Sequence, residues 1–245
     1  MIKLRRFKRR EDVTAAAADV VCALLAARPG AVVGLATGRT QEPLFAELLR
    51  RHRRGEVSFR QARFFHLDEY WRLPGSSPQS MSHTLRALFV GATDLPPDRF
   101  HCVDGMAADP AVEAARYEAE IRQTGGIDLQ LLGMGTNGHI GFNEPGSPHD
   151  SRMRLVTLTE ETRHQNRDFF PPDAVVPDQA LTMGIATILA AKSILVLVTG
   201  ASKRTALQAA IEGTISAACP ASALRRHPDC TMLCDAEAVS SLKGM

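Results

Sequence analysis

Apolar residues recur along the chain in two patterns, one typical of helices and one typical of buried strands. From Glu11 to Ala27 the apolar positions lie three and four residues apart, the spacing of an amphipathic helix. The run 31–36 is continuously apolar, and a second helical pattern covers 41–52. Continuous apolar runs of this length are typical of strands buried on both faces of a parallel sheet. This part of the sequence therefore predicts a helix, a strand and a second helix in succession.

The alternation of strand and helix patterns continues to the end of the sequence. It predicts strands at 2–8, 63–67, 99–103, 129–132, 154–158, 193–198 and 231–234, and helices at 81–90, 109–123, from about 160, from about 203 to 212, and briefly at the C-terminal end. Neither an internal repeat nor a linker interrupts this order. Such alternation predicts an α/β fold, with a single doubly wound, Rossmann-like domain over 1–245, a mostly parallel sheet and helices on both faces.

Composition narrows the class of protein. The formal net charge is only +2, which argues against nucleic acid or an anionic membrane as the partner. The two basic clusters at 5–10 and 50–54 are interpreted as solvated surface. Five cysteines without a CxxC pair indicate neither a disulfide framework nor a zinc ribbon, so no metal site is expected. No apolar run is long enough for a spanning helix, and acidic residues interrupt a possible signal peptide. A soluble, cytoplasmic protein is expected.

Polar clusters follow the predicted strands at the points where the strands end. They comprise 37–40, 68–70, 137–144 and 202–203. Parallel strands bring their carboxyl ends to one edge of a sheet, where open α/β folds bind ligands. The sequence therefore predicts a single ligand site built from these four clusters.

The glycine-rich cluster is the most informative of the four. Gly133, Gly135 and Gly138 match the dinucleotide-binding fingerprint by letter, but the glycines and Pro145 that follow leave no room for the helix which that fingerprint requires. The segment instead places His139 among amide and carboxylate side chains, a combination suited to acid–base catalysis.

Three of the four clusters, the glycine-rich one included, have a structural alternative when each is taken alone. Asp68 and Glu69 could cap the next turn, His139 could be structural, and the run Thr37, Gly38, Arg39 and Thr40 could be a helix cap. The last run also has the features of an anion site, because it precedes a helix N-terminus. The expected meeting of the clusters at one sheet edge favours the functional interpretation.

Together the motifs resemble those of the glucosamine-6-phosphate deaminase family. The resemblance covers nearly the whole chain, in order, and rests on the stretches 34–38, 67–70, 135–147, 180–184, 200–203 and 222–229. The related 6-phosphogluconolactonases share the fold and the glycine-rich core. They look less similar, since they usually have Arg where Tyr70 stands and lack the continuation Phe-Asn-Glu-Pro after the core.

The resemblance implies the conversion of glucosamine 6-phosphate to fructose 6-phosphate and ammonia without a required cofactor. Asp68 matches the family's base for the C2 proton, and His139 matches its ring-opening residue, oriented by Asn137 and Glu144. The phosphate is expected on the 37–40 turn together with Lys203. The implied partner is a phosphorylated amino sugar.

Three positions depart from the family's pattern. Asn137 stands where many members have Asp; its amide can accept a hydrogen bond from His139 but supplies no charge, so His139 should be less basic. Asp168 occupies the place of a phosphate-binding Arg, with Arg167 one residue earlier. Arg39 stands where a small residue is usual. We hypothesise that Arg39 supplies the missing phosphate charge, with Arg167 as the other candidate.

Two further functions stay open at this stage. A lactonase would use His139 on a bound water and tolerate replacement of Asp68, whereas a sugar-phosphate sensor would have no use for an enolising base. The oligomeric state is also open, and a homo-oligomer is possible. Because Val156 replaces a Lys of the family's allosteric pattern, weak or absent activation by an acetylated sugar phosphate is expected.

Overall fold

A computed structural model describes residues 2–242 of the chain and contains a central sheet of seven strands. Every neighbouring pair in this sheet is parallel, which confirms the expected α/β class. Apolar side chains on both faces of the inner strands explain this arrangement, since a parallel sheet is covered on both sides. In spatial order the strands are β1 (Lys3–Phe7), β10 (Cys230–Asp235), β9 (Ser193–Val198), β6 (Leu129–Gly133), β2 (Val32–Leu35), β3 (Arg63–His66) and β5 (Phe100–His101).

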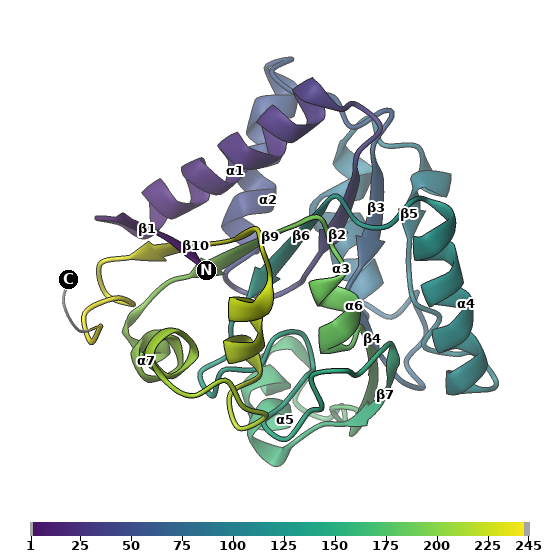
Figure 1. Ribbon diagram of the computed structural model, residues 1–245. Coiled ribbons are helices and arrows are strands. Elements are labelled where there is room, and N and C mark those ends of the chain that lie inside the picture. Colours follow the sequence, from purple (N-terminus) through teal and green to yellow (C-terminus); the bar gives the residue numbers. More distant parts are fainter. Residues whose placement is uncertain (1, 243–245) are drawn as a thin grey trace.

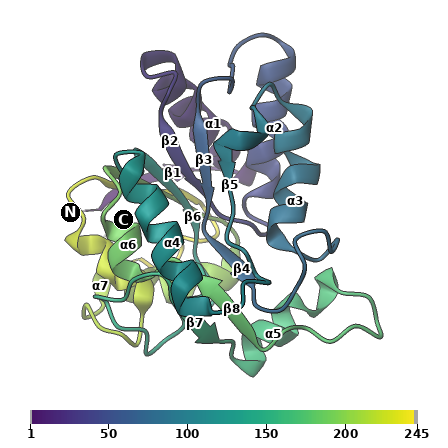
Figure 2. The same cartoon turned by 90° about the vertical axis from the view of Figure 1, so that its right-hand side faces the viewer.

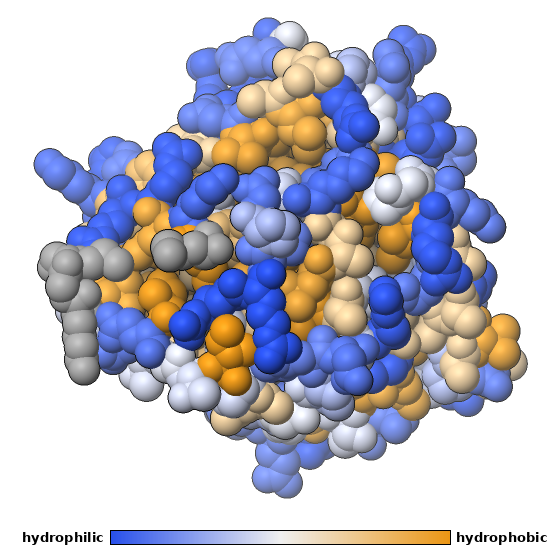
Figure 3. All heavy atoms as spheres, viewed as in Figure 1, coloured by the Kyte–Doolittle hydropathy of each residue, from blue (hydrophilic) through white to orange (hydrophobic). Residues whose placement is uncertain are grey.

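Helices cover both faces of this sheet (Figures 1 and 2). Successive strand residues point to opposite faces, so Phe64 and Phe65 belong to two different apolar clusters. One cluster includes α1 (Arg10–Ala27), α2 (Glu42–Arg53) and α3 (Met81–Leu88), and the other includes α4 (Pro110–Gln123), α6 (Ile185–Leu189) and α7 (Arg204–Glu212). On the face shown in Figure 3, hydrophilic side chains surround the apolar ones that remain visible.

A second, antiparallel sheet of three strands lies beside the first and was not predicted. It consists of β4 (Asp68–Tyr70), β8 (Gln179–Thr182) and β7 (Arg154–Thr157). The residues 68–70 were expected as a polar cluster directly after the strand 63–67, and no strand was expected at 179–182. The chain instead runs from β3 through Leu67 directly into β4, which pairs Asp68 with Thr182. This small sheet and α5 (Glu160–Asn166) enclose the carboxyl edge of the large sheet.

Two smaller expectations also differ from the structure. The helix α6 was not predicted, and the segment 236–241 forms turns instead of the short terminal helix. The carboxylate of Asp235 accepts hydrogen bonds from the backbone N–H groups of Gly200 and Ala238, which favours a tight turn after β10. Among residues 2–242, no helix is long and apolar enough to cross a membrane.

Candidate active site

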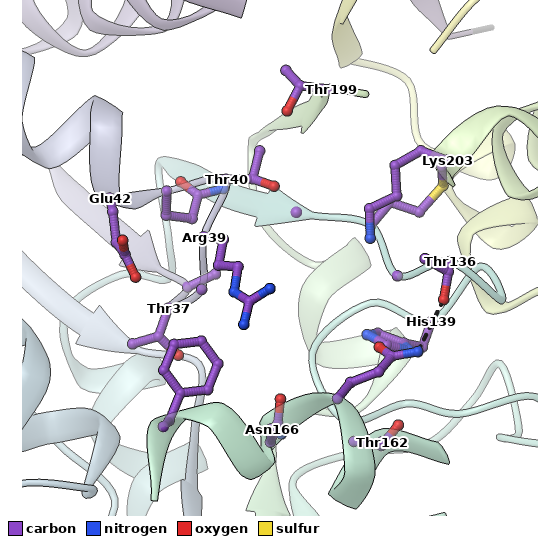
Figure 4. A pocket seen from close by; sticks show the side chains of 18 of the residues that line it. Thr37, Arg39, Thr40, Glu42, Thr136, His139, Thr162, Asn166, Thr199 and Lys203 are labelled. Atoms are coloured by element: carbon purple, nitrogen blue, oxygen red, sulfur yellow. Dashed lines mark hydrogen bonds between the residues drawn. The ribbon is translucent and has the colours of Figure 1, made fainter. Parts of the chain in front are cut away.

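A cavity of about 1030 Å³ lies at the carboxyl edge of the large sheet. Residues from all four predicted polar clusters line it, including Thr37, Asp68, His139 and Lys203. Figure 4 shows Arg39, His139 and Lys203 projecting toward the same space from different elements. The polar ends of four distant segments are therefore brought together by the parallel strand order.

Asp68 is a buried carboxylate at the wall of this cavity. It follows β3 and begins β4, and it is only 4% exposed. Within the described residues its carboxylate accepts no hydrogen bond, and the ring of His66 lies close to it, with 3.8 Å between His66 Nε2 and Asp68 Oδ1. Burial, together with the nearby charge of Glu69, raises the pKa of Asp68 to about 8. Such a group has the proton affinity that a base acting near neutral pH requires.

Glu69 has a structural role, although it is adjacent to Asp68 in the sequence. Its carboxylate accepts hydrogen bonds from the backbone N–H groups of Met81 and Ser82 and from the Ser80 hydroxyl at the start of α3. A carboxylate at this position satisfies N–H groups that have no partner inside the helix. The capping interpretation thus holds for Glu69, whereas Asp68 faces the cavity.

His139 stands at the centre of a small polar network. Asn137 Nδ2 donates to Glu144 Oε2 at 2.9 Å, and the Asn137 Oδ1 atom accepts from the backbone N–H of His139 at 3.1 Å. His139 Nδ1 lies 3.7 Å from Glu144 Oε2. Asn137 thus accepts a hydrogen bond from His139, as the sequence suggested it could, but from the backbone N–H and not from the ring.

The environment of His139 keeps the ring neutral. Burial lowers the pKa of His139, and the charge of Glu144 opposes this effect only in part. The Thr162 hydroxyl of α5 donates to Glu144, so the helix beneath the cavity fixes the carboxylate. A neutral imidazole can accept a proton at one nitrogen and donate one at the other.

The segment Thr37–Thr40 forms the turn before α2. Gly38 has a φ of +115°, a backbone conformation that favours glycine, and its carbonyl accepts from the backbone N–H of Gln41. On another side of the cavity, Lys203 lies in a short 3₁₀ turn directly before α7. Partial burial lowers the pKa of Lys203, and it has no carboxylate partner within residues 2–242. Helix N-termini and an ammonium group that lacks a partner are well suited to an anion.

The two candidate arginines lie in different places. Arg39 lines the cavity, where its Nη2 atom lies 2.5 Å from Asp168 Oδ2 and its guanidinium lies over the ring of Phe169. The guanidinium of Arg167 instead donates to the backbone carbonyls of Pro172 and Ala174, and Arg167 is absent from the cavity wall. Arg39 is therefore the candidate that faces the cavity, whereas the guanidinium of Arg167 serves the 171–174 loop.

Sequence reasoning missed several cavity residues. Lys8, Arg9 and Arg10 belong to the basic cluster interpreted only as solvated surface, yet they lie at the exposed rim of the cavity. Arg10 Nη2 donates to the Arg39 carbonyl at 2.8 Å and so supports the 37–40 turn. These residues follow β1, a parallel strand, so their position at the same sheet edge could have been inferred. Asn166, which bonds the Tyr70 hydroxyl, carried no comparable signal.

The described part of the chain contains no group of three or more His, Cys, Asp or Glu side chains arranged to hold a metal ion. What it does contain is a buried carboxylate, an imidazole and an ammonium group around a turn before a helix. Such a combination at the carboxyl edge of a parallel sheet is typical of α/β enzymes that act on small anionic substrates, and it places the chain in this class.

The comparisons with known proteins identify the family within this class. The chain belongs to the family of glucosamine-6-phosphate isomerases and 6-phosphogluconolactonases, whose model matches residues 8–233. It is 46% identical over 233 residues to a glucosamine-6-phosphate deaminase from Hahella chejuensis, covering 95% of this chain and 89% of that protein.

Solved structures agree with this assignment. A monomeric glucosamine-6-phosphate deaminase superposes with a TM-score of 0.95 at 42% identity, covering 98% of this chain and 99% of that one. A 6-phosphogluconolactonase from Trypanosoma cruzi superposes with a TM-score of 0.79 at 21% identity, covering 99% and 97%. The lactonase likeness concerns the fold alone, and the deaminase is the nearer relative of the two.

Proposed function

We propose that this chain is a glucosamine-6-phosphate deaminase, which converts glucosamine 6-phosphate and water to fructose 6-phosphate and ammonia. The observation that carries the proposal is the position of Asp68, a buried carboxylate that accepts no hydrogen bond from residues 2–242 and lies at the wall of a cavity that also contains His139. The high similarity to deaminases over the full length supports the same activity. We further propose that one domain of one chain forms the complete site.

The first chemical step opens the sugar ring. A proton leaves the hydroxyl on C1 and another reaches the ring oxygen, which frees the C1 aldehyde. His139 is the proposed carrier, since a neutral imidazole can take one proton and give the other. Glu144 lies 3.7 Å from its Nδ1 atom and stabilises the imidazolium that forms in between, and Asn137 holds Glu144 in place.

The second step moves a proton from C2 to C1. Asp68 takes the C2 proton, the electron pair of the C–H bond forms a C1–C2 enol, and Asp68 then returns the proton to C1. C1 is thereby reduced to an alcohol and C2 oxidised to an imine. The proton that the C1 oxygen gains is matched by the proton that the amine nitrogen loses, so electrons and protons balance within the sugar. Water adds to C2 and the C–N bond breaks, which releases ammonia and leaves the ketone. The raised pKa of Asp68 suits it both to take the proton from C2 and to return that proton to C1.

The phosphate is the proposed anchor of the substrate. Backbone N–H groups of the Thr37–Thr40 turn and the ammonium group of Lys203 are suited to its oxygens. Arg39 adds guanidinium donors from the same turn, where its ion pair with Asp168 holds the side chain in the cavity.

A phosphorylated sugar is too polar to cross a membrane unaided, and we therefore propose that the enzyme acts in the cytoplasm.

One assay tests the activity directly. Ammonia release should follow the addition of glucosamine 6-phosphate, and it should fall by at least about 10³-fold in Asp68→Asn, which has the same shape without a base. Glucosamine without the phosphate should react far more slowly. Hydrolysis of 6-phosphogluconolactone that survives Asp68→Asn would instead favour the lactonase, and binding of the sugar phosphate without turnover would favour a sensor.

A further inference from the structure

His66 is a buried histidine that the mechanism above does not use. It is the last residue of β3, its side chain is fully buried, and neither ring nitrogen forms a hydrogen bond within residues 2–242. Its backbone carbonyl is fixed by the Tyr117 hydroxyl of α4 at 2.7 Å. Buried polar groups normally have partners, so an imidazole with two unused nitrogens beside an active site calls for a functional explanation.

A polar group of the cavity wall that lies close to this ring is the proposed base. His66 Nε2 lies 3.8 Å from Asp68 Oδ1, and the Asp68 carboxylate also has no hydrogen-bond partner in the described part of the chain. A relative movement of about 1 Å would bring the two atoms to hydrogen-bond distance. This single bond would satisfy a buried donor and a buried acceptor at once, and it would gain strength from the low dielectric around them.

The two oxygens of Asp68 have different surroundings. Oδ1 lies on the side of His66, whereas Oδ2 lies next to Gly141, where an added Cβ atom would come within 3.3 Å of it. Gly141 is part of the cavity wall. Oδ2 is therefore the oxygen placed to meet a substrate, and Oδ1 is available for a supporting contact.

We propose that His66 is a positioning residue for the base, whose neutral ring donates its Nε2–H to Asp68 Oδ1 and leaves Oδ2 free for the C2 proton. The proposal rests on the deaminase function proposed above. The bond can persist through the reaction, because Oδ1 remains an acceptor when the transferred proton is on Oδ2. His66 thus keeps the carboxylate in one rotamer while the proton travels from C2 to C1.

The charges around His66 suit this role. Burial lowers the pKa of His66 to about 4, so the ring is neutral and has one N–H to donate at physiological pH. Two carboxylates lie near it, those of Asp68 and Glu69 in β4. Glu69 is already bonded to the N-terminus of α3, and the paired position of His66 in β2 is the apolar Leu35. The Tyr117 hydroxyl of α4 donates to the backbone carbonyls of His66 and His101 and not to the His66 ring, which leaves Asp68 as the partner for the ring.

Two variants test the proposal, with ammonia release as the assay. His66→Leu removes the donor and keeps an apolar side chain of similar size, and His66→Gln keeps a donor on a flexible side chain. We expect His66→Leu to lower kcat by about 10- to 100-fold with KM changed less than about threefold, and to move the acidic limb of the kcat profile upward by about one pH unit. His66→Gln should restore most of the loss. The melting temperature of His66→Leu should change little, because burying a leucine in place of a polar imidazole offsets the loss of one hydrogen bond.

Other results would overturn the proposal. An unchanged pH profile in an active His66→Leu variant would overturn it. Equal losses of kcat in both variants, together with a lower melting temperature, would also overturn it, because they would indicate a merely structural role. If the wild type released no ammonia, the proposed function would fail instead. In that case the infrared carbonyl band of protonated Asp68, followed against pH, still tests the contact. An apparent pKa equal in the wild type and His66→Leu would refute it.

Discussion

Arg39 Nη2 lies 2.5 Å from Asp168 Oδ2, which links the turn after β2 to the segment that follows α5. Both side chains line the cavity and are more than half exposed, 63% for Arg39 and 71% for Asp168. An exposed pair of this kind contributes little to stability. Its main effect is to fix the guanidinium at the cavity while neutralising part of its charge.

This pair gives opposite predictions for its two members. Arg39→Ser removes a phosphate donor and leaves the Asp168 carboxylate to repel the substrate, so KM for glucosamine 6-phosphate should rise about 10-fold or more. Asp168→Asn frees the Arg39 charge for the phosphate, so KM should fall by about two- to fivefold. Steady-state kinetics of ammonia release measure both changes.

Arg167→Ser provides the matched control for these variants. It also removes one arginine from the same segment, but from a side chain that bonds the backbone of the 171–174 loop outside the cavity wall. KM should therefore stay within about twofold of the wild type. An unchanged KM in Arg39→Ser, or an increase in Asp168→Asn, would rule out a phosphate contact by Arg39.

The large sheet could be predicted from the sequence because its inner strands are continuous apolar runs. Residues 193–198 and 31–36 have no polar alternation, and such runs fit only strands covered on both faces. The strand β8 (Gln179–Thr182) gave no such signal, since only two of its four residues are apolar and its partners β4 and β7 are distant in sequence. Short antiparallel pairing depends on tertiary contacts that a local pattern does not contain.

The activity should depend on pH through Asp68. The carboxylate must be ionised to accept the C2 proton, and its pKa is raised to about 8 by burial and by the charge of Glu69. We expect kcat/KM to rise about tenfold per pH unit below pH 8 and then to level off. Measurements between pH 6 and 9.5 test this prediction. A limb near pH 4, the usual range of an exposed carboxyl, would show that the base is not held in this environment.

The same carboxyl group should influence stability. Because the pKa of Asp68 is raised in the folded state, its contribution to stability is greatest below pH 4 and is lost as the pH rises toward 8. Asp68→Asn removes this titration and keeps the shape. Its melting temperature should therefore match that of the wild type near pH 4 and exceed it by several degrees at pH 8. A difference that does not change between these pH values would contradict the burial of an ionisable group.

The place of the candidate site in the fold could be predicted from the sequence, but the contacts that its side chains make could not. The strand ends placed Asp68, His139 and Lys203 at one edge. The family resemblance selected Asp68 as the base, but only the structure gives the physical reason, since Asp68 faces the cavity and Glu69 caps α3. In a strand, adjacent side chains point in opposite directions, and a polar cluster that was not assigned to a strand cannot supply that distinction.

The variant Asn137→Asp tests whether the charge at position 137 influences the pKa of His139. Asn137 Nδ2 donates to Glu144, and an Asp at this position can no longer donate to it, although its oxygen can still accept from the His139 backbone. The added negative charge should raise the pKa of His139, which burial now keeps low. We expect an increase of about one pH unit in the titration of the His139 ring signals by NMR. A titration unchanged from the wild type would show that the charge at position 137 does not reach the ring.

Gly141 leaves the space in front of Asp68 open. Its φ is +57°, and an added Cβ atom would approach Thr182 Oγ1 to 3.0 Å and Asp68 Oδ2 to 3.3 Å. Gly146 has a φ of +98° and nothing within 4 Å of such an atom, so it offers the same kind of backbone strain without the crowding. Both Ala variants should lose about 1 kcal/mol of unfolding free energy. Only Gly141→Ala should also lower kcat, by about 10- to 100-fold, because its methyl group displaces the reactive oxygen. Equal kcat values in the two variants, measured by ammonia release, would show that Oδ2 does not face the substrate.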